Sequence, residues 1–171
     1  MEEIVDECLA TLIADIDNTP FVLNSPTITE GGTIPATHTC DGTNQSPQLL
    51  WGPNPPAGTL SFAMVLTNTS NGLVHSVFYD IPSSLTGLPA NVENSYAPPS
   101  VPGMHTTLAY DNVTRGWAGP CSPTTQSYEI AVYAINASTL PGSTMSTTRA
   151  AAVTSIMANS LGVTKLNAVY P

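Results

Sequence analysis

An imidazole and a thiol are placed where they could do chemistry. His75 opens the β-rich run HSVFYDI, so its ring can face a cavity at the end of a strand. Cys121 lies in the loop WAGPCSP, whose prolines make it stiff enough to form the wall of a pocket. Cys121 or a serine beside His75 would make a nucleophile and base pair, whereas a lone histidine is more often a structural side chain. The chain has no nucleophile elbow, glycine-rich phosphate loop or paired-carboxylate motif, which favours binding over catalysis.

The three cysteines allow at most one disulfide within the chain. Cys40 and Cys121 both lie in loop sequences, and Cys8 lies among regularly spaced apolar residues near the start. Two readings stay open, a bridge between Cys40 and Cys121 in an exported protein, or buried free thiols. Because no CxxC or Cys/His metal spacing is present, we expect no metal and no cofactor.

The charge balance restricts the partners. The chain carries twelve acids against the three bases Arg115, Arg149 and Lys165, a net charge of −9. Three cations cannot neutralise many phosphates, so we expect neither nucleic acid nor an anionic membrane surface as partner. No apolar run is long enough for a transmembrane segment. The scarcity of lysine and the abundance of Ser, Thr and Asn favour a periplasmic or extracellular protein, with the cytoplasm as the alternative.

The chain divides into two parts. Residues 1–19 are predicted to form an acidic amphipathic helix and a linker, because apolar residues recur there at three- and four-residue spacings. This helix would dock on its own domain or join two copies in a homo-oligomer. Residues 20–171 are predicted to form one mainly β domain, a sandwich of two antiparallel sheets with a C-terminal helix.

Short β-rich runs separated by Pro, Gly, Asn and Asp support that fold. The predicted strands are FVLNS (21–25), SFAMVLT (61–67), HSVFYDI (75–81), SYEIAVYAI (127–135) and LNAVY (166–170). The run 146–161 has a Ser/Thr start and several alanines, so it is predicted to be a helix that stops at Gly162. The connection 83–118 is long, and loops of that length are usually functional or variable.

Three stretches together resemble the phosphatidylethanolamine-binding proteins, in particular their prokaryotic branch labelled Raf-kinase-inhibitor-like. They are FVLNSPTITEGGTIPATHTCDGTNQSPQLLWGPNPPAGTLSFAMVL, VHSVFYDIP and WAGPCSPTTQSYEIAVYAI. The likeness spans roughly residues 21–171 and leaves the N-terminal helix outside. It implies a two-sheet sandwich with a small pocket at one end, which accepts phosphate, phosphoryl head groups or similar anions.

The resemblance also implies the residues of that pocket. The predicted ligand-binding residues are His75, Tyr128, Asn68, Ser70, Pro120, Pro123 and Gln126. The chain departs from the family pattern at several of these positions and their neighbours. Asn68 and Ser70 replace two acids, Ser76 a tryptophan, Ser122 a proline, and Gln126 and Ser127 a histidine and an arginine. Without carboxylate support His75 should be less readily cationic, which weakens anion binding. The loss of the two acids also removes a repulsion toward a dianion, so the net effect on anion affinity stays open.

These observations favour a non-enzymatic protein that binds a small anionic or polar ligand, such as a phospholipid head group, in a degenerate pocket. One alternative is a protein-interaction module that uses the N-terminal helix or the 83–118 loop. The other is a biosynthetic-pathway enzyme that uses His75 for acid/base chemistry.

Overall fold

A computed structural model describes residues 20–171 of the chain. Its main sheet is antiparallel, with the strand order β5-β3-β2-β6-β7. These strands are β2 (Ser61–Asn68), β3 (Leu73–Pro82), β5 (His105–Thr106), β6 (Gln126–Ile135) and β7 (Ser160–Tyr170). A small antiparallel sheet pairs β1 (Leu49–Leu50) with β4 (Gly87–Leu88). The remaining elements are the short 3-10 helix η1 (Ala36–His38) and the helix α2 (Arg149–Asn159).

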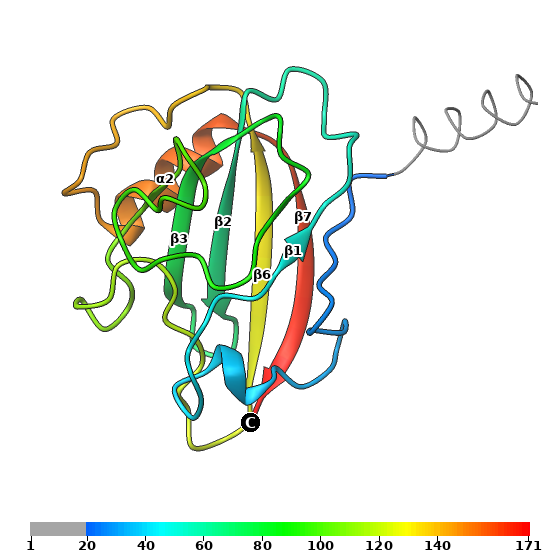
Figure 1. The fold of residues 1–171 in the computed structure, drawn as a ribbon, viewed down its shortest axis with the longest axis vertical. Helices are drawn as coiled ribbons and strands as arrows, with labels where there is room; N and C mark the ends of the chain where they lie inside the picture. The colour runs from blue at the N-terminus through cyan, green and yellow to red at the C-terminus, as the bar shows by residue number, and fades with distance from the viewer. Residues whose placement is uncertain (1–19) are drawn as a thin grey trace, which may run out of the picture.

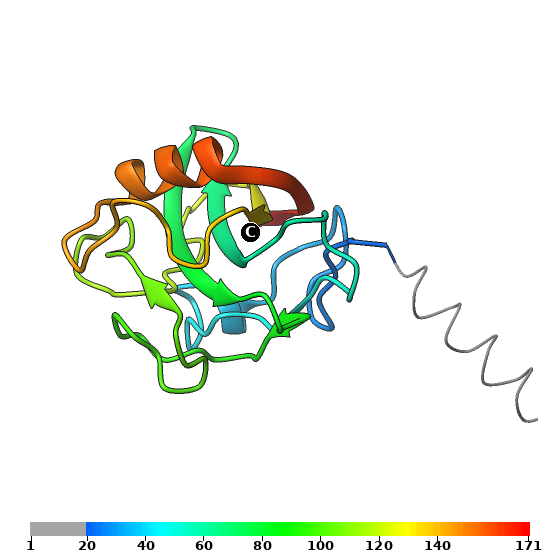
Figure 2. The same cartoon turned by 90° about the horizontal axis from the view of Figure 1, so that it is seen from above.

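The predicted mainly β fold with two antiparallel sheets and a helix in the C-terminal part is confirmed, although the second sheet has only two strands. Figure 1 shows the long strands of the main sheet side by side, with α2 across one face. The view from above places α2 on one side of this sheet and the small sheet with its long loops on the other (Figure 2). The predicted N-terminal helix, and the homo-oligomer it would support, lie outside the described residues.

The central strand β2 is buried on both faces, because a hydrophobic core lies on each side of it. Phe62, Met64 and Leu66 belong to the core beneath the small sheet. Ala63 and Val65 belong to the second core, under α2. Alternate residues of a strand point to opposite faces, so one uninterrupted apolar run serves both cores. Burying each large side chain contributes about 1.5–3 kcal/mol.

The segment Phe21–Ser25, predicted to be a strand, makes only one bridge to the small sheet. Asn24 and Leu50 exchange both backbone hydrogen bonds, at 2.8 and 2.9 Å. The next hydrogen-bonding position along the chain is Pro26, which has no N–H to donate. The pairing therefore stops after one residue pair.

The predicted end of the helix at Gly162 is wrong. The helix α2 begins after Thr148, whose side chain accepts a hydrogen bond from the N–H of Ala151, and it ends at Asn159 because Ser160 is already extended. Gly162 lies within β7, opposite Ala134. A Cβ atom at Gly162 would lie 2.8 Å from Cγ of Pro56, so the glycine permits a close approach of chains.

We expect Gly162→Ala to lower the free energy of unfolding by about 1–3 kcal/mol, because the added methyl group meets the ring of Pro56. Urea denaturation of four proteins tests this in a double-mutant cycle: the parent, Gly162→Ala, Pro56→Ala and the double variant. The loss should shrink in the Pro56→Ala background, where Cγ is gone. An equal loss in both backgrounds would show that Pro56 is not the obstacle.

Candidate functional site

Three neighbouring strands bring polar side chains together at one end of the main sheet. Asn68 ends β2 and lies directly opposite Tyr128, near the start of β6. His75 lies close to the start of β3, which is paired with β2 on its other side. These side chains border a cavity of about 160 Å³, here called the His75 pocket. It is lined by Asn68, Asn71, Leu73, His75, Tyr110, Cys121, Ser122, Gln126 and Tyr128.

Of the predicted site residues, the structure thus gathers four around one cavity: His75, Tyr128, Asn68 and Gln126. The other three are not among the lining residues. Pro120 is buried, and its carbonyl accepts a hydrogen bond from Cys40. Pro123 and Ser70 are exposed.

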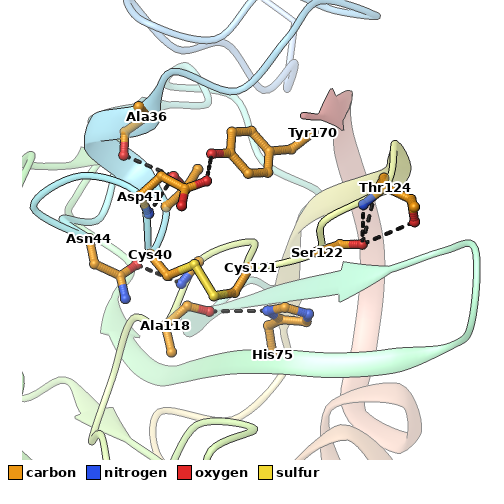
Figure 3. Close-up of a disulfide and its surroundings, with 12 residues drawn as sticks. Ala36, Cys40, Asp41, Asn44, His75, Ala118, Cys121, Ser122, Thr124 and Tyr170 are labelled. Carbon is orange, nitrogen blue, oxygen red and sulfur yellow. Dashed lines mark hydrogen bonds between the residues drawn. A yellow bond between two sulfur atoms is a disulfide. The ribbon is translucent and has the colours of Figure 1, made fainter.

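The loop 117–121 is fastened to the rest of the domain at several points (Figure 3). A disulfide joins Cys121 to Cys40, and the backbone N–H of Cys40 donates to the carbonyl of Pro120 at 3.0 Å. The N–H of Gly119 donates to the side chain of Asn44 at 2.9 Å, and the N–H of Ala118 donates to the hydroxyl of Ser76 at 2.9 Å. The loop is therefore a fixed wall beside His75. Its Cys121 and the next residue, Ser122, line the pocket, whereas Pro120 and Pro123 do not.

The hydrogen bonds of His75 decide which ring nitrogen carries the proton. Its Nδ1 lies 3.2 Å from the carbonyl oxygen of Ala118 (Figure 3), and because a carbonyl only accepts, Nδ1 must be the donor. Nε2 has no hydrogen-bond partner in the described part of the chain. Burial lowers the pKa of His75 below its ordinary value of 6.5. Backbone hydrogen bonding to Ala118 and Gly119 opposes part of this shift, and the charge of Arg149 makes a smaller contribution in the same direction as burial. At neutral pH the ring is uncharged and Nε2 is an acceptor.

The other polar groups of the pocket have equally definite roles. The Oδ1 atom of Asn68 accepts from the N–H of Ser70 at 2.9 Å, so its NH₂ group is turned toward the pocket, 3.5 Å from the Tyr128 hydroxyl and from Gln126 Oε1. Burial raises the pKa of Tyr128, so its hydroxyl stays protonated and can donate. The pocket therefore offers donors at Asn68 and Tyr128 and acceptors at His75 and Gln126. None of the residues that line it carries a formal charge at neutral pH.

Tyr110 is a residue of this site that the sequence did not indicate. Its ring centroid lies 4.2 Å from that of His75, and the Tyr128 ring meets the same imidazole edge-on at 5.5 Å. Tyr110 is held there by its backbone N–H, which donates to the carbonyl of His75 at 2.9 Å. No sequence signal marks this contact, because a backbone hydrogen bond between a loop and a strand requires no particular side chain.

The other two histidines serve the fold. His38 is buried between the Thr27 hydroxyl, at 2.9 Å, and the carbonyl of Gln45, at 2.8 Å. His105 lies 2.8 Å from Asp80, whose second oxygen accepts from the N–H of Leu140 and so ties the 136–148 segment to β3. Within residues 20–171, no group of three or more His, Cys, Asp or Glu side chains is arranged to hold a metal ion. No helix in the same range is long and apolar enough to cross a membrane.

The comparisons with known proteins agree with this architecture. The phosphatidylethanolamine-binding protein family matches residues 24–171, so the chain belongs to that family. A UPF0098 protein of Methanothermobacter thermautotrophicus is 33% identical over 120 residues, which cover 67% of this chain and 76% of the relative. A UPF0098 protein of Aquifex aeolicus is 34% identical over 101 residues, 57% of this chain and 56% of the relative.

Two solved structures share the fold. E. coli YbcL, described as a member of the mammalian PEBP family, superposes with a TM-score of 0.74 at 25% identity, covering 89% of this chain and 98% of YbcL. The PEBP homologue CT736 of Chlamydia trachomatis gives a TM-score of 0.71 at 17% identity, covering 87% of this chain and 95% of CT736. The chain thus has the family fold over almost all of the described residues.

Loss of the Cys40–Cys121 disulfide should lower the free energy of unfolding by about 2–5 kcal/mol, because the bridge closes a loop with a sequence separation of 81 residues. The measurement compares urea denaturation of Cys8→Ser with that of Cys8→Ser/Cys40→Ser/Cys121→Ser. The shared Cys8→Ser change removes the remaining thiol from both proteins. Equal midpoints would contradict a stabilising bridge.

His75 should make stability depend on pH. The pKa of His75 is lower in the folded protein than in the unfolded chain, so as the pH falls the imidazole of the unfolded chain is protonated first. The stability that comes from the neutral ring is present above pH 6.5 and is lost as the pH falls through the folded pKa. The free energy of unfolding of the parent should therefore fall relative to that of His75→Gln between pH 7.5 and pH 5, measured by urea denaturation. A constant difference between the two proteins would refute this reading of His75.

Proposed function

We propose that this protein is a non-enzymatic binding protein that holds a small polar or anionic head group in the His75 pocket. The observation that carries the proposal is the convergence of four oriented polar groups on one cavity of about 160 Å³, against a wall fixed by a disulfide. A site of this kind fixes the orientation of a small ligand without a charged partner. Membership of the phosphatidylethanolamine-binding protein family supports a small-ligand role.

The protonation of His75 determines which ligands fit. A neutral ring presents the Nε2 lone pair, which repels a fully ionised oxyanion and accepts from a ligand that carries a donor hydrogen. An anion therefore binds together with one proton, carried by the ligand as a P–OH group or by His75 itself. This makes the pocket a weak anion site at neutral pH and a stronger one in acid. A ligand that carries its own donor hydrogen, such as a hydroxyl, an amide or a protonated phosphate monoester, fits the pocket both at neutral pH and in acid.

The disulfide supports an exported protein. Such bonds form and persist in the periplasm and outside the cell, and they are rare where glutathione keeps thiols reduced. The ligand would then be met in the periplasm or in the extracellular medium.

Ethanolamine O-sulfate is a suitable probe, because its sulfate keeps one charge between pH 5 and pH 8 and only the protein titrates. Binding is followed at constant ionic strength by NMR, through the side-chain amide signals of Asn68 and Gln126. In the parent, affinity should rise by about tenfold for each pH unit by which the solution approaches the pKa of His75 from above. His75→Gln should bind weakly and without this pH dependence.

The matched control is His105→Gln, which removes another imidazole while its amide can still donate to Asp80. The affinity of His105→Gln for ethanolamine O-sulfate should equal that of the parent at every pH. The absence of binding to the parent at any pH, or the same pH dependence in His75→Gln, would overturn the proposal.

A further inference from the structure

A second, larger cavity lies beside the His75 pocket, with Leu73 in the lining of both. It measures about 500 Å³ and is here called the arginine cleft. Three segments enclose it: the start of β3, the turn between Leu108 and Arg115, and residues 145–150 at the start of α2. In Figure 1 the start of α2 lies next to the yellow-green loop that carries this turn.

Two of the three bases of the whole chain line this cleft. Arg115 and Arg149 are both half-buried, and they come from segments more than thirty residues apart. The ion pairs among the described residues are His105–Asp80 and Lys165–Glu129, so neither arginine has a carboxylate within 4.0 Å there. In a chain with twelve acids, two guanidinium charges thus face one cavity without a direct ion pair, and Arg149 interacts with the carboxylate of Asp111 only at longer range.

Backbone carbonyls hold the two guanidinium groups in place. Arg115 donates to the carbonyls of Met145 at 2.9 Å and Thr106 at 3.3 Å. Arg149 uses Nη1 for the carbonyls of Leu108 and Ala109. Arg115 also lies over the ring of Tyr96, with Cζ 5.5 Å from the ring centroid. Carbonyl oxygens and an aromatic ring orient a guanidinium but do not neutralise its charge.

Donor atoms remain on both side chains. Nε and Nη2 of Arg149 and Nε of Arg115 make no hydrogen bond to another described residue. The nearby carboxylate of Asp111 does not take them up, because it accepts from Val113 and Thr114 in its own turn. These donor atoms are therefore available to a ligand.

The start of α2 adds positive potential to the same place. Arg149 is the first residue of the helix, and the first turn contains no acid. A helix N-terminus favours negative charge, so an arginine there is unfavourable unless an anion lies nearby. The N–H groups of Arg149 and Ala150 have no acceptor within the helix.

We propose that the arginine cleft binds a small organic oxyanion, a sulfate or phosphate ester, with its charged group between Arg115 and Arg149 and its organic part against the apolar wall. That wall consists of Leu73, Val74, Leu108 and Met145. The volume of the cleft exceeds what an inorganic ion needs, and it falls within the range of small-molecule sites. The site does not depend on the His75 pocket having a ligand.

The two sites are electrostatically linked. The charge of Arg149 contributes to the lowered pKa of His75, so an anion that neutralises Arg149 raises that pKa. Arg149 is the charged group that acts on His75, while the hydroxyls of Tyr110 and Tyr128 beside the imidazole stay uncharged because burial raises the pKa of both. By reciprocity, protonation of His75 strengthens binding in the cleft.

Inorganic sulfate and butyl sulfate are the probes for the cleft, titrated at constant ionic strength against chloride. The readout is the set of backbone amide signals of residues 108–115 and 145–150 by NMR, with dissociation constants from calorimetry. We expect butyl sulfate to bind more tightly than inorganic sulfate, at pH 8 as well as at pH 6. Arg149→Gln and Arg115→Gln should each weaken binding by about 10- to 100-fold.

Two further variants keep the test decisive if an arginine substitution disturbs folding. Ala150→Glu places an acid in the exposed first turn of α2, which should raise the melting temperature and yet abolish sulfate binding, because the new carboxylate occupies the arginines. Ala150→Gln is its neutral match and should bind like the parent. Lys165→Gln removes the same charge from β7 and should leave binding unchanged.

Several outcomes would overturn the proposal. They are the absence of shifts at residues 108–115 and 145–150, an equal loss in Lys165→Gln, or unchanged binding in Ala150→Glu. Equal affinity for sulfate and butyl sulfate would reduce the site to an adventitious ion only. Because His75→Gln should retain butyl sulfate binding, failure of the His75 pocket and failure of the arginine cleft remain distinguishable.

Discussion

The double-sided burial of β2 is the constraint on which the rest of the molecule depends. One strand supplies Phe62, Met64 and Leu66 to one core and Ala63 and Val65 to the other, so it cannot slip by one residue without exchanging the two sets. This fixed register places Asn68 opposite Tyr128 at the end of the sheet. The strand positions that border the His75 pocket are therefore fixed by apolar packing along the length of β2.

The wall of the pocket shows how the chain compensates for an apolar, stiff loop. Residues 118–121 donate and accept hydrogen bonds through their backbone, to Ser76, Asn44, His75 and Cys40. These bonds satisfy polar atoms that would otherwise be buried without partners, at a cost of about 1–3 kcal/mol each. The carbonyl of Ala118 also sets the tautomer of His75. The same contact thus stabilises the loop and determines the chemistry that the pocket can offer.

The sequence predicted the elements that have a strong period and missed those that have none. The central strands and α2 follow from apolar runs and a Ser/Thr cap, although the helix is shorter than expected and β7 begins directly after it, at Ser160. The two-residue strands β1, β4 and β5 are too short for any periodicity. Four pocket residues came from the family resemblance. The place of Tyr110 in the His75 pocket could not be predicted from the sequence, and neither could the presence of Arg115 and Arg149 in one cleft. Backbone carbonyls and N–H groups set both arrangements, and they leave no mark in the sequence.

The disulfide makes residues 40–121 a closed covalent ring that contains β2, β3 and the long connection after them. The most exposed large hydrophobic side chain of the described residues, Val113 at 81%, lies in a surface turn within this ring. A protease that cleaves the turn at Val113 opens the ring, but the two fragments do not separate. The disulfide still joins them, and their strands still pair in the main sheet. A chain cleaved at this turn would therefore remain one covalent molecule until the disulfide is reduced.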